Sequence, residues 1–105
     1  MKDILLATPA VLMTALTATA SIAAPSSYSG HELEKNAKIT MAKATTIATR
    51  ARPGEVTDRE LEREGGGSGL RYSFDIKSAG TTYEVGVDAM TGKVLENSKE
   101  GPNPD

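Results

Sequence analysis

Apolar and polar side chains alternate along several stretches in the second half of the chain. The clearest is 70–77, where Leu, Tyr, Phe and Ile alternate with Arg, Ser, Asp and Lys. The stretch 81–88 alternates in the same way through Tyr83, Val85 and Val87. A period of two residues is typical of a strand that buries one face. Both stretches are therefore predicted to be strands, and residues 94–97 a short last strand.

Residues 56–64 are the most polar of the predicted strands. Leu61 is the only strongly apolar residue among the positions of its parity, which also include Thr57, Arg59 and Arg63. This pattern favours a polar edge strand, while a charged helix is the rival on local propensity.

A helix is predicted to begin after Thr40, whose side chain can accept a hydrogen bond from a free backbone N–H of the first turn. The helix ends before Pro53-Gly54. Its apolar positions follow the i, i+3, i+4, i+7 spacing of one helix face. They are mostly small, which would let the helix lie close against a sheet: Ala44, Ile47, Ala48 and Ala51.

Short connections join the predicted strands. The glycine-rich run 65–69 is interpreted as a flexible connection, and 78–80 as a turn. Asp88, Thr91 and Gly92 are assigned to a structural turn before the last strand. An Asp side chain can bind backbone N–H groups just downstream, and glycine tolerates the positive φ that closes many turns. Gly92 is therefore predicted to have φ > 0.

This order of elements predicts an α+β fold. One helix packs on an antiparallel sheet of three to four strands, in the order helix, strand, strand, strand. A single helix can cover the apolar face of such a sheet, which would carry Leu61, Leu70, Tyr72, Phe74, Ile76, Tyr83, Val85 and Val87.

The first 23 residues have the layout of a secretory signal peptide. Lys2 precedes an apolar block at 4–16, which is shorter than the roughly 20 apolar residues of a spanning helix. Small residues at Ser21 and Ala23 suit cleavage after Ala23; an uncleaved anchor or a soluble helix is the alternative. We expect a periplasmic or secreted protein with a signal peptide at 1–23, a flexible or weakly helical leader at 24–38, a domain at 39–98 and a disordered tail at 99–105.

The amino-acid composition limits the kinds of functional site that the chain can form. The 105-residue chain has no Cys and a formal net charge of −2, so disulfides, thiolate metal sites and a basic nucleic-acid footprint are not expected. The single histidine, His31, lies in the leader, where a solvated side chain is the simpler interpretation. Glu60, Glu62 and Glu64 could bind a cation weakly, but a solvated edge interleaved with arginines explains them more simply. We expect no enzyme activity, no cofactor and no metal.

With this order of elements, the sequence resembles a PepSY domain. The resemblance covers roughly residues 39–96. The motifs that match are Ile39-Thr40, the alanine stripe of 44–51, Pro53-Gly54, Glu60-Leu61-Glu62, the strand 72–76, and Tyr-Glu-Val-Gly-Val-Asp-Ala-Met-Thr-Gly-Lys-Val-Leu at 83–95. The resemblance implies a non-catalytic module outside the bacterial cytoplasm, with a role in inhibiting or regulating peptidases.

Two functions follow as hypotheses. The first is an exported binding module that inhibits or modulates a peptidase. The second is an envelope sensory or stress accessory protein that binds a membrane sensor or a small ligand. In either case the partner-binding residues are expected on the edge strand 56–64, at Arg59, Glu60, Glu62 and Arg63. An edge strand exposes backbone groups to which a partner's extended segment can add. We expect a monomer that neither binds nucleic acid nor stays in the membrane after cleavage.

Overall fold

A computed structural model describes residues 28–101 of the chain. The expected signal peptide and the end of the expected tail, residues 102–105, lie outside the described residues. The elements in chain order are the 3₁₀ helix η1 (His31–Asn36), the helix α1 (Met41–Ala51) and the strands β1 (Glu55–Arg63), β2 (Leu70–Ser78), β3 (Thr81–Asp88) and β4 (Val94–Lys99).

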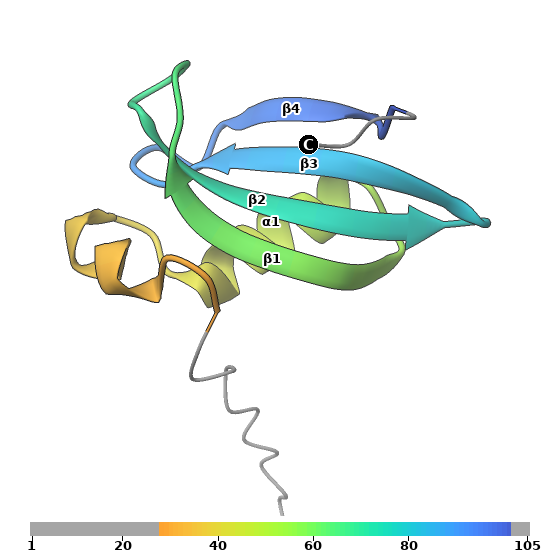
Figure 1. The fold of residues 1–105 in the computed structure, drawn as a ribbon, viewed down its shortest axis with the longest axis horizontal. Coiled ribbons are helices and arrows are strands. Elements are labelled where there is room, and N and C mark those ends of the chain that lie inside the picture. Colours follow the sequence, from red (N-terminus) through yellow and green to blue (C-terminus); the bar gives the residue numbers. More distant parts are fainter. Residues whose placement is uncertain (1–27, 102–105) are drawn as a thin grey trace, which may run out of the picture.

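The four strands form one antiparallel sheet in the order β1-β2-β3-β4, and α1 lies across one of its faces (Figure 1). This confirms the predicted α+β architecture, with four strands after one α-helix. The segment 56–64, for which a helix was the rival interpretation, belongs to a strand over Glu55–Arg63. Pairing with β2 overrides the helical propensity of its charged residues, since propensity is a weak preference beside tertiary contacts.

Two hydrogen bonds stabilise the start of α1, one from within the helix and one from the sheet. The Thr40 side chain caps the helix by accepting a hydrogen bond from the backbone N–H of Lys43 at 3.1 Å. The Tyr72 hydroxyl donates to the Ile39 carbonyl at 2.7 Å, which ties the helix entry to β2. Met41, Ala44 and Ala48 form the buried side of the helix. Two of these are alanines, so the helix backbone can approach the sheet closely.

The core lies between α1 and the sheet, on the face that the alternation predicted. Phe74 is 1 % exposed and pairs in register with Val85, which is also 1 % exposed. Tyr83 is only partly buried, and its ring faces the Arg52 guanidinium at 3.8 Å. The largest apolar side chains that are fully buried in this core are Leu61, Tyr72, Phe74, Ile76, Val85 and Val87.

Segment 28–36 is more ordered than the sequence indicated. Whether residues 32–38 are helical could not be decided from propensity, and the structure places η1 at His31–Asn36. Tyr28 and Leu33 pack against the core. Their apolar surface offsets the cost of ordering this short segment.

Candidate functional site

The four residues expected to contact a partner do not share one face of β1. Leu61 is buried in the core on the helix side of the sheet and pairs with Tyr72. Since side chains alternate along a strand, Arg59 and Arg63 lie on the helix side with Leu61. Glu60 and Glu62 lie on the opposite face, where the Ser73 hydroxyl donates to a Glu62 carboxylate oxygen at 2.8 Å. The arginines and the glutamates therefore belong to two different surfaces.

The edge of β1 is already paired at one point by the chain itself. Ser29 forms a parallel bridge with Glu60, and the backbone N–H of Leu61 donates to the Ser29 carbonyl at 2.9 Å. Gly30 has φ 86°, and a side chain there would collide with the Leu61 carbonyl. Beside this bridge the edge is hollowed, with a volume of about 280 Å³, and Tyr28, Ser29 and residues 56–60 line the hollow. The β1 edge is therefore bridged at one residue, and a hollow lies beside that bridge.

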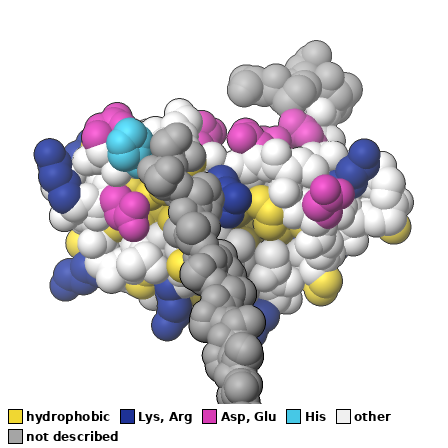
Figure 2. Space-filling view, turned by 90° about the horizontal axis from the view of Figure 1, so that it is seen from below, with side chains coloured by type: hydrophobic (Ala, Val, Ile, Leu, Met, Phe, Trp, Pro, Cys, Tyr) yellow, Lys and Arg dark blue, Asp and Glu magenta, His cyan; other side chains and the backbone are white. Residues whose placement is uncertain are grey.

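The face of the sheet away from α1 is hollowed and strongly acidic. The hollow has a volume of about 560 Å³, and the residues that line it include no Lys and no Arg within the described part of the chain. In Figure 2, seen from below the view of Figure 1, acidic side chains lie along the upper margin, and Lys and Arg lie at the left, at the bottom, near the centre and at the upper right. We call this surface the acidic face; its carboxylates are Asp58, Glu60, Glu62, Glu64, Asp75, Glu84, Glu96 and Glu100.

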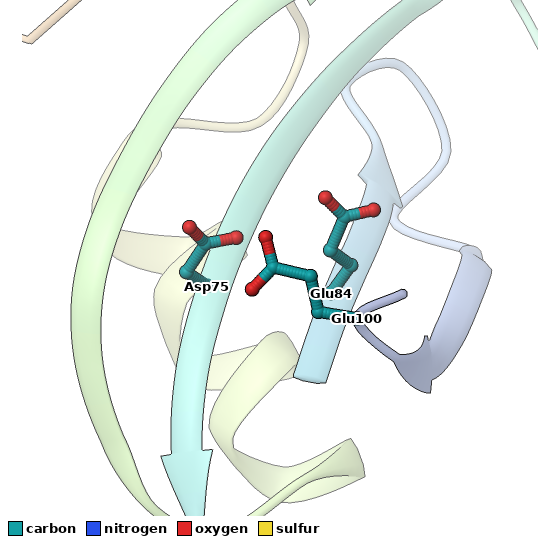
Figure 3. A group of neighbouring side chains, drawn as sticks. All are labelled: Asp75, Glu84 and Glu100. Atoms are coloured by element: carbon teal, nitrogen blue, oxygen red, sulfur yellow. The ribbon is translucent and has the colours of Figure 1, made fainter. Parts of the chain in front are cut away.

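Three of these carboxylates meet at the end of the acidic face that contains Asp58. Asp75 comes from β2, Glu84 from β3 and Glu100 from the residue after β4, and their side chains turn toward one another (Figure 3). One carboxylate oxygen of each lies within 4.8 Å of the others. Three such oxygens could contact a hard cation, but Ca²⁺ takes six to eight oxygen ligands. The geometry alone does not make this cluster a metal centre.

Burial, and then repulsion between neighbouring carboxylates, disfavours the ionised form of Asp75 and Glu84. Burial, followed by the nearby charges of Glu100 and Asp58, raises the pKa of Asp75. Burial and then the charge of Glu96 raise the pKa of Glu84. Repulsion between like charges is unfavourable, so a cation that reached this face would relieve it.

One arginine is built into the acidic face. Arg71 is 8 % exposed, and its Nη1 lies 3.4 Å from a carboxylate oxygen of Glu64 and 3.4 Å from one of Glu96. Its Nη2 donates to the Gly65 carbonyl at 3.0 Å. A side chain at Gly86 would lie 2.9 Å from the Arg71 Cδ, so the glycine lets the arginine lie flat across β3. Its buried Nε has no acceptor among residues 28–101.

The Asp88 side chain forms hydrogen bonds both within the predicted turn after β3 and with the connection between β1 and β2. Asp88 is 2 % exposed and accepts hydrogen bonds from the backbone N–H groups of Met90 at 2.8 Å and Thr91 at 3.1 Å, as predicted for a turn. It also accepts from the backbone N–H and the hydroxyl of Ser68, at 2.6 and 2.9 Å. Gly92 has φ 82°, which confirms the predicted positive φ.

The contacts to Ser68 anchor the glycine-rich run 65–69, which the sequence had indicated only as a flexible connection. Burial by itself would raise the pKa of Asp88, but the hydrogen bonds from Ser68, Met90 and Thr91 outweigh it and lower the pKa to about 2. Asp88 therefore stays ionised in the fold and has a structural role.

The remaining candidate, His31, stands at the start of η1. Its side chain is 56 % exposed, and its Nδ1 lies 3.8 Å from a carboxylate oxygen of Glu32. Histidine in a nucleophilic mechanism needs a nucleophile within hydrogen-bond reach. The contacts described for His31 are to Glu32 and to the edge of the Tyr28 ring, and neither supplies one.

Sequence reasoning noticed part of the acidic face and missed the rest. The glutamates at 60, 62 and 64 were recognised as one row, but Asp75, Glu84, Glu96 and Glu100 were not connected with them. The sequence does indicate that Asp75 and Glu84 point away from the core, because they occupy the polar positions of two alternating strands. What was missing was the register that places Asp75 opposite both Asp58 and Glu84.

The described residues form a small α+β module with one hollow beside the β1 edge and a second, acidic hollow on the sheet face away from α1. The chain belongs to the PepSY family: the family model described as "Peptidase propeptide and YPEB domain" matches residues 38–97. Modules of this family are generally non-catalytic and resemble propeptides or inhibitors. No curated protein and no solved structure matches the chain. Within the described residues, no helix is both long and apolar enough to cross a membrane.

Proposed function

We propose that this protein is an exported, non-enzymatic binding module that inhibits or modulates a peptidase through the edge of β1. Membership of a family of peptidase propeptides supports the class of partner. The parallel bridge between Ser29 and Glu60 supports the mode of contact and carries the proposal, because it is an example of chain addition at this edge.

The contact would be made by strand addition. A partner's extended segment would occupy the hollow beside residues 56–60 and pair with the free backbone groups of β1. Peptidases bind their substrates as extended chain, so a peptidase segment that pairs with β1 would be held in a geometry that such enzymes already use. Arg59 and Arg63, on the helix side of the strand, would contact acidic groups of the partner, and Glu60 and Glu62 would face its basic groups.

Export is the second part of the proposal. The apolar block at 4–16 and the small residues before Ala23 support removal of a signal peptide, which would release a periplasmic or secreted monomer. The intact mass of the protein recovered from the periplasm or the medium measures this directly. We expect the mass of a chain that begins at Ala24, and a mass that still includes the apolar block would contradict export with cleavage.

The peptidase function is tested by titrating the purified protein into exported peptidases from the same cell and measuring the rate of peptide cleavage. We expect a saturable fall in rate that the double variant Arg59→Glu, Arg63→Glu weakens. The matched control is Lys43→Glu, Lys99→Glu, which makes the same charge change at two exposed positions away from the β1 edge. Equal inhibition by both double variants would show that the β1 edge is not the contact.

A pull-down from periplasmic extract separates the two functional classes. Recovery of a peptidase supports the proposal. Recovery of a membrane sensor, with no effect on any peptidase, would favour the sensory alternative. Saturable turnover of any substrate by the purified protein would overturn the non-enzymatic proposal altogether.

A further inference from the structure

We infer that residues 28–36, which we call the strap, are a displaceable cover of the β1 edge that competes with the partner for this edge. The inference rests on the proposed function, because it concerns regulation of the same contact. It adds that the edge is closed in the free protein and that the partner binds as the strap leaves.

The strap covers the part of the core that α1 leaves open. The helix α1 packs mainly on β2, β3 and β4, whereas η1 packs on β1. In Figure 1, η1 lies at the end of the sheet where β1 terminates. Leu61 is the one buried residue of β1, and Tyr28 and Leu33 pack against the cluster that contains it. The strap therefore shields β1 as α1 shields the other three strands.

Few contacts hold the strap to the sheet. Its backbone meets β1 at the isolated bridge between Ser29 and Glu60, where the Leu61 N–H donates to the Ser29 carbonyl at 2.9 Å. No residue of η1 is buried, and Tyr28 and Leu33 are only partly buried. A segment with one bridge and little buried apolar surface opens at a lower free energy than the core strands do.

The strap keeps its internal hydrogen bonds when it leaves the sheet. The Tyr28 hydroxyl donates to a Glu34 carboxylate oxygen, and backbone hydrogen bonds of 2.8 to 3.1 Å run within 28–37. The N–H groups of residues 38 and 39 both donate to the Ala89 carbonyl, which fixes the following chain to the domain. Ala37, between the two parts, has an extended backbone. The strap can therefore swing about Ala37 as one unit.

The strap also occupies the regular part of the β1 edge. The pairing of β1 with β2 shifts register between Val56 and Asp58 and is continuous from Asp58 to Arg63. A bulge disrupts a strand locally, so the regular part is the better template for an added strand. The strap lies against Glu60 and Leu61, in the middle of this part. A partner segment that pairs along it therefore has to displace the strap.

Displacement also defines the chemistry of the partner's segment. When Tyr28 and Leu33 leave, the apolar surface of the core beside Leu61 loses its cover. Apolar surface exposed to water is unfavourable, so a wholly polar segment would displace the strap poorly. The segment that fits is extended and carries a large apolar side chain that takes the place of Tyr28 against the core.

Hydrogen exchange of the purified protein, followed by NMR, measures opening of the strap. Backbone N–H groups alternate between the two sides of a strand, so the Leu61 N–H faces the strap and the Glu62 N–H faces β2. We expect Leu61 to be at least about tenfold less protected than Glu62. The variant Tyr28→Ala, Leu33→Ala should lower the protection of Leu61 further and leave that of Glu62 unchanged.

A matched control changes the strap without removing its apolar anchors. The variant His31→Ala, Lys35→Ala replaces two exposed side chains of the strap. Its protection at Leu61 should equal that of the wild type, because neither side chain packs against the core.

A reversible disulfide measures the competition with the partner. In the variant Ser29→Cys, Glu60→Cys the two Cα atoms belong to bridged neighbours about 5 Å apart, within the range that a disulfide spans. The chain has no other cysteine, so oxidation fixes the strap and reduction frees it in the same molecule. We expect the oxidised form to inhibit the peptidase at least about fivefold more weakly than the reduced form. Wild-type protein with and without reductant controls for the effect of the reductant on the peptidase.

Two results would overturn the inference. The first is equal protection of Leu61 and Glu62 in the wild type and in Tyr28→Ala, Leu33→Ala, which would mean that the strap does not open by itself. The second is equal inhibition by the oxidised and reduced forms of the disulfide variant, which would place the partner beside the strap, in the hollow at 56–60. Failure of the proposed function gives a different result: no form of the protein inhibits a peptidase, whereas Leu61 still loses protection when its anchors are removed.

Discussion

Replacing Asp88 by Asn tests whether the ionised Asp88 side chain stabilises the fold by joining the turn after β3 to Ser68 in the glycine-rich connection. The carboxylate accepts four hydrogen bonds from the described residues, two of them from Ser68 in the β1–β2 connection. Asn keeps the size of the side chain and can still accept from Met90 and Thr91 through its oxygen. It loses the negative charge, however, and turns an amide group toward the Ser68 N–H. We therefore expect Asp88→Asn to destabilise the fold.

The magnitude follows from the pKa of Asp88. Its ordinary value is 3.8, and in the fold it falls to about 2. One pKa unit corresponds to about 1.4 kcal/mol, so ionised Asp88 contributes about 2–3 kcal/mol to folding at neutral pH. Since Asp88 is 2 % exposed, solvent screening reduces this value little. A domain of this size has about 5–10 kcal/mol in total, so the loss is large.

Urea denaturation followed by circular dichroism measures the effect, and its pH dependence identifies the cause. A lowered pKa gives stability that is present above 3.8 and is lost as the pH falls toward 2. The difference between wild type and Asp88→Asn should therefore be full at pH 7 and shrink across that window. An unchanged midpoint at pH 7, or a difference that persists undiminished near pH 2, would refute the reasoning.

Asp75→Asn is the matched control, because it makes the same chemical change with the opposite expected sign. Burial, Glu100 and Asp58 raise the pKa of Asp75, so its ionised form disfavours folding. Removing that charge should raise the midpoint at pH 7. If both variants lower the midpoint equally, the loss of a carboxylate is harmful for a reason other than its local contacts.

Three further predictions concern the core, the turn and the acidic face. Phe74→Ala should cost about 3–5 kcal/mol, because it removes a ring that is 1 % exposed; an unchanged denaturation midpoint would contradict its place in the core. Gly92→Val should destabilise by about 1–3 kcal/mol, because φ is 82° and the new Cβ would lie 3.3 Å from the Ile47 Cδ1; Gly92→Asn should be milder, and equal midpoints for both variants would argue against backbone strain. A raised pKa in the fold favours the protonated form, so lowering the pH from 7 toward 4.5 should stabilise the protein as Glu84 takes up its proton; Glu84→Gln should flatten this part of the profile, and a profile unaffected by that change would rule out the assignment.

The sequence by itself determined most of the strand residues that form the core, apart from Tyr83, which is only partly buried, and much of the local geometry. The alternation at 70–77 identified the buried side of β2 correctly, because a strand that hides one face must carry its apolar residues at every second position. Thr40 and Gly92 were also predicted correctly, since capping and a positive φ depend on the chemistry of one residue and its nearest backbone.

Only the tertiary structure decided which polar residues come together. Asp75, Glu84 and Glu100 lie on three different segments, and their meeting depends on strand order and register, which no local pattern contains. The same holds for Asp88, whose turn was predictable but whose bonds to Ser68 cross 20 residues of chain. Apolar burial is specified by spacing along one strand, whereas a polar site is specified by the pairing of several strands.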